Sequence, residues 1–344
     1  MISVRMIRII IFISLCCVLI VSCKYQQSEG NFISVAGFTQ GTTYHITYQS
    51  GDSVDLSVQF DSLLHVFDHS LSTYLPSSII TAINENQEDV ETDTLFRTVF
   101  REAERVNKLS GGAFDITIGP IIDAWGFGSG AKLEIDSAVI DSLLQFVGMN
   151  KVWLDNGQII KSNPGVRLDV NAIAQGYAVD FVSAFLDEKG VKNYLVEIGG
   201  ELRTKGLNPK RTLWGIGVDR PDDGNMLPGD HLQTIIRLSG RSLATSGNYR
   251  KYYEIDGVKY HHSIDPATGY SKSSRLLSTT IIAESCISAD AYATSCMVMG
   301  LEKAKEFISG LKGVDAYLIY SDSSGVFQVW HTPGLGKYLE QPSR

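Results

Sequence analysis

The helix-like and strand-like patterns of this chain come in groups rather than alternating one for one, and this grouping most constrains the fold. Apolar residues recur at helical spacing from Asp61 to Leu71 and from Leu95 to Leu109, and Gly111-Gly112 ends the second pattern. Hairpin signals stand between such segments, and Asp155-Asn156-Gly157-Gln158 is the clearest of them. Helices grouped between hairpins predict an α+β fold with mixed or antiparallel sheets and packed helices.

The same patterns predict the remaining elements, and no fixed-period repeat interrupts them. A glycine-rich run, Gly126-Phe127-Gly128-Ser129-Gly130, lacks the following lysine and the preceding apolar strand of a phosphate loop, so we expect an ordinary loop. The other expected elements are a strand over 43–48, the hairpin strands 152–154 and 159–161, a helix over 172–186, strands over 194–198 and 213–218, a hairpin around 254–258, helices over 289–299 and 302–309, and strands over 316–320 and 326–330.

The first two dozen residues have the pattern of an export signal. Arg5 and Arg8 precede an apolar run of thirteen residues, Ile9 to Val21. That run has the length of a signal-peptide core and is shorter than the ~20 residues of a membrane-spanning helix. It ends in Ile20-Val21-Ser22-Cys23, which resembles a lipobox, with Cys23 as the residue that is diacylated after cleavage. The alternative is an ordinary secretory signal with an incidental cysteine.

A lipid anchor would place the mature chain in the bacterial cell envelope. Two kinds of acyl attachment at one cysteine exceed the marginal hold of a single chain, so we expect tethering to the periplasmic face of the inner membrane. The expected organisation is a signal peptide over 1–22, a lipid-anchored tether over 23–32 and a functional domain over 33–344.

Charge and cysteine content exclude several classes of protein. The formal net charge is −8, and removing two arginines with the signal gives −8 − 2 = −10, so we expect no nucleic-acid partner. After Cys23 only Cys286 and Cys296 remain. We interpret them as two buried thiols rather than a disulfide scaffold or a metal site, although an oxidising compartment would allow them to pair.

The first of four polar clusters is Ser288-Ala289-Asp290-Ala291-Tyr292-Ala293-Thr294. Ser288 is a plausible N-cap, which would put Asp290 in the first turn of a helix. Asp290 and Thr294 are four residues apart and therefore project from one helix face. A carboxylate and a hydroxyl on one face suit Mg²⁺ that also binds substrate phosphates. These seven residues alone, however, favour a simple helix cap.

The other three clusters are equally weak when each is taken alone. The segment from Arg167 to Tyr177 places a helix start after an apolar strand end, where backbone groups can meet a phosphate or a ribose. The segment from Tyr260 to Gly269 carries His261 and His262 before an Asp-Pro-Ala-Thr-Gly turn, and on a strand only one of the two histidines would face a site. Gly111 to Asp115 has the pattern of a helix end followed by the start of a strand.

Together with other segments these clusters resemble the ApbE-type FAD:protein FMN transferases over nearly the whole mature chain. The matching segments, in order, are Gln40-Gly41-Thr42-Thr43, Leu71-Ser72-Thr73-Tyr74, Gly112-Ala113-Phe114-Asp115, Leu168-Asp169 through Gly176-Tyr177, Glu197-Ile198-Gly199-Gly200-Glu201, Ala244-Thr245-Ser246-Gly247, His262 to Gly269, and Ala289-Asp290-Ala291 to Thr294.

The resemblance implies an α+β fold of the ApbE type, with FAD in a central cleft, and a set of site residues. Gln40 stands where the family usually has methionine near the flavin, and Gln175 where lysine or glutamate is more common. The cation, expected to be Mg²⁺, would be held by the backbone carbonyl of Ala172 and the side chains of Asp290 and Thr294. The residues implied to contact FAD are Gln40, Tyr74, Ala113, Phe114, Asp115, Asp169, Gln175 and Ile264.

The family reaction implies that a threonine or serine of an acceptor protein attacks FAD, so that FMN stays attached through a phosphoester and AMP departs. His262 is the candidate base, because imidazole titrates near neutral pH, and the alternative is that it only orients the pyrophosphate. The acceptor is expected to be a subunit of a membrane redox complex. Three rival interpretations are an Mg²⁺-dependent FAD pyrophosphatase, a non-catalytic flavin-binding lipoprotein and a structural envelope protein.

Overall fold

The structure, a computed structural model, describes residues 30–222, 229–248, 252–255, 258–261, 263–271 and 274–340. The predicted signal peptide, the lipidation site Cys23 and the candidate base His262 lie outside these residues. Among the described helices, none combines the length and the apolar character that crossing a bilayer requires.

An eight-stranded sheet forms the centre of the fold, and every neighbouring pair of its strands is antiparallel. Its order is β1-β2-β5-β6-β9-β12-β13-β14. The strands are β1 (Asn31–Thr39), β2 (Thr42–Ser50), β5 (Tyr194–Ile198), β6 (Glu201–Lys205), β9 (Ser242–Gly247), β12 (Leu276–Ala283), β13 (Asp315–Ser321) and β14 (Phe327–His331).

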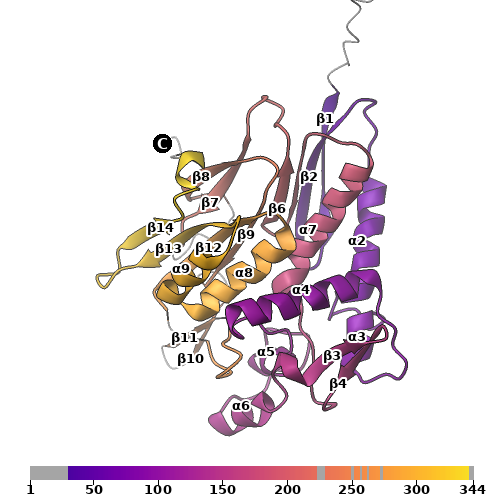
Figure 1. The fold of residues 1–344 in the computed structure, drawn as a ribbon, viewed down its shortest axis with the longest axis vertical. Helices are drawn as coiled ribbons and strands as arrows, with labels where there is room; N and C mark the ends of the chain where they lie inside the picture. The colour runs from indigo at the N-terminus through magenta and orange to yellow at the C-terminus, as the bar shows by residue number, and fades with distance from the viewer. Residues whose placement is uncertain are drawn as a thin grey trace, which may run out of the picture.

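Helices cover one face of this sheet. α7 (Asn171–Glu188) packs on β5 and β6, and α8 (Cys286–Met299) packs on β9 and β12, as Figure 1 shows. α2 (Ser57–Leu71) and α4 (Thr94–Ser110) pack in turn on α7, and α9 (Leu301–Gly310) packs on α8. α8 is buried on nearly all sides, and most of its side chains are small or apolar, with Asp290 and Thr294 as polar residues on one face.

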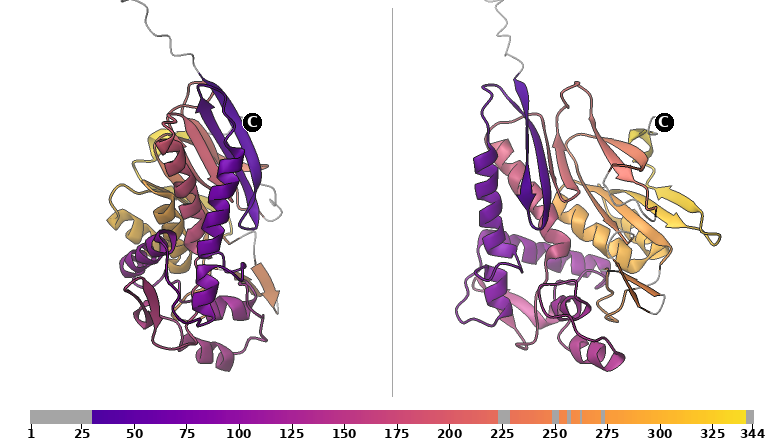
Figure 2. Two further views of the ribbon diagram at one scale, coloured as in Figure 1. Left: turned by 90° about the vertical axis from the view of Figure 1, so that its right-hand side faces the viewer. Right: turned by 180° about the vertical axis from the view of Figure 1, so that it is seen from behind.

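A small three-stranded sheet covers the opposite face at one end. Its order is β15 (Leu339–Glu340), β8 (Leu232–Leu238) and β7 (Trp214–Asp219). A second core joins Ile216 and Ile236 of this sheet to Leu202, Leu243 and Ile282 of the large sheet. The arrangement is therefore three layers at this end, and Figure 2 shows it from two further sides.

The remaining elements form a cap beside the sheet, at the bottom of Figure 1. In this cap α5 and α6 pack around Ile121, Trp125 and Ile140, and Ile264 joins the same cluster. The indole N–H of Trp125 donates to the carbonyl of Gly269 at 2.9 Å, which ties the loop after Ile264 to α5. The elements are α3 (Ile79–Asn84), α5 (Gly119–Trp125), α6 (Ser137–Leu144) and the hairpins β3 (Val152–Asp155) with β4 (Gln158–Lys161) and β10 (Tyr252–Ile255) with β11 (Val258–His261).

The predicted α+β fold with antiparallel sheets is confirmed, and one helix start was predicted wrongly. Gly111 ends α4 in the left-handed region with φ 63°, as its position predicts. α8, however, begins at Cys286 and not after Ser288. Ser288 is no cap: its hydroxyl donates to Glu102 of α4. Asp290 therefore lies beyond the first turn of its helix.

The two cysteines are free and buried in α8. They are ten residues apart on this one helix, a rise of about 15 Å at 1.5 Å per residue. A disulfide needs Cα atoms roughly 4.4–6.8 Å apart. Pairing of Cys286 with Cys296 would therefore require α8 to unwind.

Candidate active site

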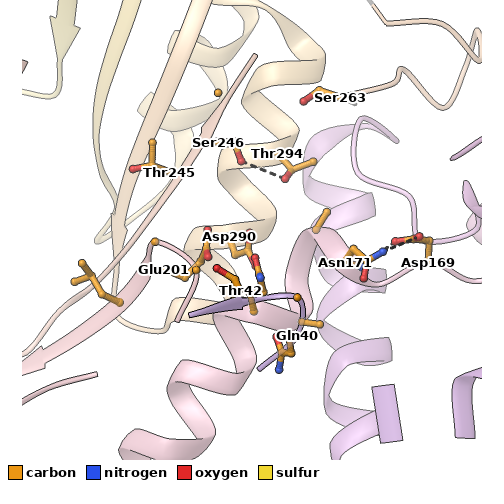
Figure 3. A pocket seen from close by; sticks show the side chains of 18 of the residues that line it. Gln40, Thr42, Asp169, Asn171, Glu201, Thr245, Ser246, Ser263, Asp290 and Thr294 are labelled. Carbon is orange, nitrogen blue, oxygen red and sulfur yellow. Dashed lines mark hydrogen bonds between the residues drawn. The ribbon is translucent and has the colours of Figure 1, made fainter. Parts of the chain in front are cut away.

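A cleft of about 1110 Å³ opens between the β1–β2 hairpin tip, the start of α7 and one face of α8. Its lining includes every cofactor and metal residue implied by the sequence resemblance: Gln40, Tyr74, Ala113, Phe114, Asp115, Asp169, Ala172, Gln175, Ile264, Asp290 and Thr294. The candidate base His262 lies outside the described residues and is therefore not among these lining residues. Figure 3 shows the centre of the cleft.

Gln40 sits at the tip of the hairpin that forms one wall. Gln40 and Gly41 have φ of 50° and 74°, the combination of a two-residue type I′ turn between Thr39 and Thr42. Both polar atoms of the Gln40 amide are buried and have no hydrogen-bond partner in the described structure. A buried unpaired amide is costly, so its placement in the cleft wall fits a residue whose partners come with a ligand.

The Ala113–Asp115 segment is fixed by hydrogen bonds of its own. Oδ1 of Asp115 accepts from the backbone N–H of Thr117 at 2.8 Å, and Oδ2 accepts from that of Met149 at 3.1 Å. Burial raises the pKa of Asp115, while these hydrogen bonds act in the opposite direction. The carboxylate therefore holds the shape of the wall, and the Phe114 side chain is part of the main core.

Asp169 stands beside this segment, just before α7, and its backbone N–H donates to the carbonyl of Ile116 at 2.7 Å. It accepts hydrogen bonds from the backbone N–H of Asn171 at 2.9 Å and from the Asn171 amide at 3.1 Å. Burial raises the pKa of Asp169 to about 6 and nearby Asp123 adds to the rise, whereas the Asn171 hydrogen bonds lower it. Tyr74 is 62% exposed and lies at the mouth of the cleft.

Asp290 projects from α8 into the cleft floor and is 5% exposed. Its Oδ2 accepts from the backbone N–H of Gly176 in α7 at 3.0 Å. Burial raises the pKa of Asp290 to about 7, and the Gly176 hydrogen bond lowers it in part. Within the described residues no lysine, arginine or histidine forms an ion pair with this carboxylate.

The oxygens around Asp290 fit a hard divalent cation. Thr294 lies one turn further along α8, and its hydroxyl is 3.4 Å from that of Ser246 on β9. Ala172 is in the first turn of α7, and the N–H that its carbonyl would accept in a regular helix belongs to Gly176, the donor to Asp290. A carboxylate, a hydroxyl and a carbonyl are ligands that Mg²⁺ accepts, with substrate phosphates or water completing the shell.

A protein-only metal cage is not present in the described part of the chain, where no group of three or more His, Cys, Asp or Glu side chains could hold an ion.

Several cleft residues received no role from the sequence. Figure 3 places Glu201 and Thr42 beside Asp290, with Asn171 on the other side next to Asp169. Glu201, Thr42 and Ser246 lie in segments that the resemblance quotes, and those segments were the available signal. Gly176, which donates to Asp290 but does not line the cleft, also lies in a quoted segment, and glycine inside a helix usually marks a close contact.

Comparison with known proteins gives consistent results along the chain. Residues 40–318 match the model of the ApbE family. A Vibrio cholerae protein named FAD:protein FMN transferase is 38% identical over 281 residues, covering 79% of this chain and 82% of that protein. A Haemophilus influenzae protein of the same name is 33% identical, covering 87% of this chain and 89% of its own.

Solved structures agree with the sequence relatives. The flavin transferase ApbE from Vibrio cholerae superposes with a TM-score of 0.81 at 32% identity, covering 90% of this chain and 99% of that chain. The apo form of the Pseudomonas stutzeri flavinyl transferase ApbE superposes with a TM-score of 0.80 at 31% identity, covering 90% and 97% respectively.

Proposed function

The chain belongs to the ApbE family, and from that premise we propose that it is an FAD:protein FMN transferase. The enzyme transfers the FMN half of FAD to a threonine or serine hydroxyl of an acceptor protein. The observation that carries this proposal is the single cleft that contains all the described residues expected to bind FAD and a cation.

In this proposal, FAD binds along the cleft, and its pyrophosphate lies over the floor formed by α7 and α8. Gln40, Tyr74, the Ala113–Asp115 segment, Asp169, Gln175 and Ile264 contact the cofactor. The Ala172 carbonyl, Asp290 and Thr294 would hold Mg²⁺, which would supply charge neutralisation and Lewis acidity to the pyrophosphate. The buried Asp290 carboxylate supports this assignment, because no described lysine, arginine or histidine forms an ion pair with it.

The reaction is a substitution at the phosphorus on the flavin side of the pyrophosphate. The acceptor hydroxyl oxygen forms a bond to that phosphorus while the bond to the AMP oxygen breaks, and AMP leaves with the electron pair. The hydroxyl proton passes to a base, for which His262 is the candidate. Such transfers depend mainly on positioning and charge stabilisation, which a rigid cleft wall and a fixed cation provide.

The decisive experiment measures the acceptor. Purified protein is incubated with FAD, Mg²⁺ and a candidate acceptor, such as a subunit of a membrane redox complex, and the acceptor is weighed by mass spectrometry. A mass gain of FMN less one water, with AMP released, supports the proposal. Free FMN and AMP with an unmodified acceptor would instead establish an FAD pyrophosphatase.

Removing the candidate base should slow transfer without weakening FAD binding. For His262→Ala we expect a loss of roughly 10²–10⁴-fold in the transfer rate, the usual contribution of a positioned base, with FAD affinity largely retained. Single-turnover kinetics and FAD fluorescence titration measure the two quantities separately. Weaker FAD binding with an unchanged rate would make His262 a binding residue.

We also propose that Cys23 carries the lipid that anchors the enzyme to the inner membrane, facing the periplasm. Cys23→Ser should move the protein from the membrane fraction to the soluble fraction, because the acyl chains provide the attachment. Fractionation with intact-mass measurement tests this. A Cys23→Ser protein that still sediments with membranes, together with a wild type lacking lipid mass, contradicts the anchor.

A further inference from the structure

Two aspartates connect α7 and α8 in a reciprocal way. Asp290 of α8 accepts from the backbone N–H of Gly176 in α7 at 3.0 Å. Asp180, one turn further along α7, accepts with Oδ2 from the backbone N–H of Ile287 in α8 at 2.9 Å. Each helix therefore gives one carboxylate to the backbone of the other.

Asp180 supplies the cap that α8 lacks in its own sequence. The N-cap residue Ser285 makes no side-chain hydrogen bond to the helix backbone. The free N–H groups at a helix start need acceptors, and a carboxylate there is favoured by the helix dipole. Because the acceptor comes from α7, α7 helps to locate the start of α8.

Arg203 of β6 holds Asp180 in place. Its guanidinium donates to Oδ1 of Asp180 at 3.2 Å and to the backbone carbonyl of Glu284 at 2.8 Å. Asp180 and Arg203 are both largely buried, with side chains 14% and 25% exposed. The strand, α7 and the segment leading into α8 thus meet at one ion pair.

We propose that Asp180 is a positioning residue for the cation site. The inference rests on the proposed function, because it assumes that Ala172, Asp290 and Thr294 bind Mg²⁺. Those oxygens come from two helices, and Mg²⁺ requires near-ideal octahedral geometry at about 2.0–2.1 Å. A connection that fixes α8 against α7 therefore sets the affinity of the site, although Asp180 touches neither the ion nor the substrate.

The chain offers a matched control. Asp187 lies two turns after Asp180 on α7 and pairs at 2.6 Å with Lys205, two residues after Arg203 on β6. This second ion pair joins the same helix to the same strand, but no described hydrogen bond of Asp187 reaches α8. This pair is more exposed than that of Asp180, with side chains 38% and 39% exposed, and Asp187→Asn removes it without touching the cap.

The experiment measures Mg²⁺ binding directly. Mg²⁺ is titrated calorimetrically into wild type, Asp180→Asn, Asp187→Asn and Asp290→Asn, each without added nucleotide, because free nucleotide would itself chelate the ion. Changes in residues that orient metal ligands cost roughly 10–100-fold in metal affinity. We expect Asp180→Asn to bind Mg²⁺ at least about tenfold more weakly, and Asp187→Asn to stay within about twofold of wild type.

The rate of FMN transfer at high Mg²⁺ concentration distinguishes a positioning residue from a metal ligand. A positioning residue leaves all ligands present, so excess Mg²⁺ should restore transfer by Asp180→Asn and should fail to restore it in Asp290→Asn. Equal Mg²⁺ affinity in the Asp180 and Asp187 variants would overturn the inference while leaving the proposed function intact. Wild-type affinity in Asp290→Asn would overturn the metal site itself, and the inference with it.

A second variant covers the case in which Asp180→Asn does not fold. Arg203→Gln keeps the Asp180 carboxylate of α7 on the Ile287 N–H of α8, and it removes the guanidinium that holds Asp180 and the Glu284 carbonyl. We expect this variant to bind Mg²⁺ about threefold more weakly than wild type, a smaller loss than the 10–100-fold cost of an outer-shell partner because the cap remains. Unchanged Mg²⁺ affinity in a folded Arg203→Gln protein contradicts the inference.

Discussion

Asp290→Asn should abolish most FMN transfer while leaving the protein folded. The substitution removes the one carboxylate assigned to the cation, and a bound metal contributes several kcal/mol to such reactions. Because 1.36 kcal/mol corresponds to a factor of ten, we expect a loss of roughly three orders of magnitude. The asparagine oxygen can still accept from the Gly176 N–H, the one hydrogen bond to this carboxylate within the described part of the chain. Transfer measured against Mg²⁺ concentration is the test, and near-normal rates would refute the metal assignment.

The pH dependence of stability gives a control for the same variant. Burial raises the pKa of Asp290 in the folded state to about 7, above the ordinary value of 3.8, and the measurement is made in EDTA so that no metal is bound. Between these values the folded state binds more protons than the unfolded state, so its stability falls as pH rises from about 4 to about 7. Asp290→Asn removes the titrating carboxyl and with it this loss of stability. The melting temperature of the variant minus that of wild type should therefore increase with pH. A difference that does not change with pH would show that burial does not raise the pKa of Asp290.

Gly176→Ala should reduce both stability and transfer, against the usual trend for glycine in a helix. Alanine is normally better there by about 1 kcal/mol. In this helix a Cβ would lie 2.5 Å from the carbonyl oxygen of Cys286 and 2.7 Å from the Cβ of Asp290. The first of these is a backbone atom, so α7 and α8 must separate, and overpacking of this kind costs roughly 1–3 kcal/mol. We expect a lower melting temperature and at least about a hundredfold loss of transfer, since Asp290 moves with α8.

Gly310→Ala is the matched control for that change. Gly310 is also helical, at the end of α9, and a Cβ built there meets no atom within 4 Å. This variant should be as stable as wild type or slightly more so, and its transfer rate should be unchanged. A stable, active Gly176→Ala protein would mean that the two helices can separate without cost, and that the geometry of the cation site tolerates the shift.

Local chemistry was enough to predict many of the elements. Gly111 ends α4 and Asn156-Gly157 turns β3 into β4, because both need left-handed backbone that glycine and asparagine adopt readily. Strands such as β12 escaped the prediction for a physical reason. Leu276–Ala283 is buried on both faces, so it lacks the alternation of polar and apolar residues that marks a half-exposed strand.

The chemical content of the site was readable in the sequence, but its assembly was not. The order of the motifs identified the family, and residues such as Asp290 and Asp169 could be named from it. That the segments around Gln40, Asp115, Asp169 and Asp290 share one cleft depends on the sheet order and on helix packing. Neither follows from spacing along the chain.

The start of α8 shows most clearly which features depend on local sequence and which depend on tertiary structure. By sequence alone Ser288 was a suitable cap, because serine before a run of small helix-forming residues is the local signal for a helix start. The structure begins α8 at Cys286 instead, where Asp180 of α7 accepts the N–H of Ile287. The sequence by itself thus determined that a helix bearing Asp290 and Thr294 would form. Only the tertiary structure decided where it starts and what holds it, because the capping carboxylate comes from a residue more than a hundred positions away.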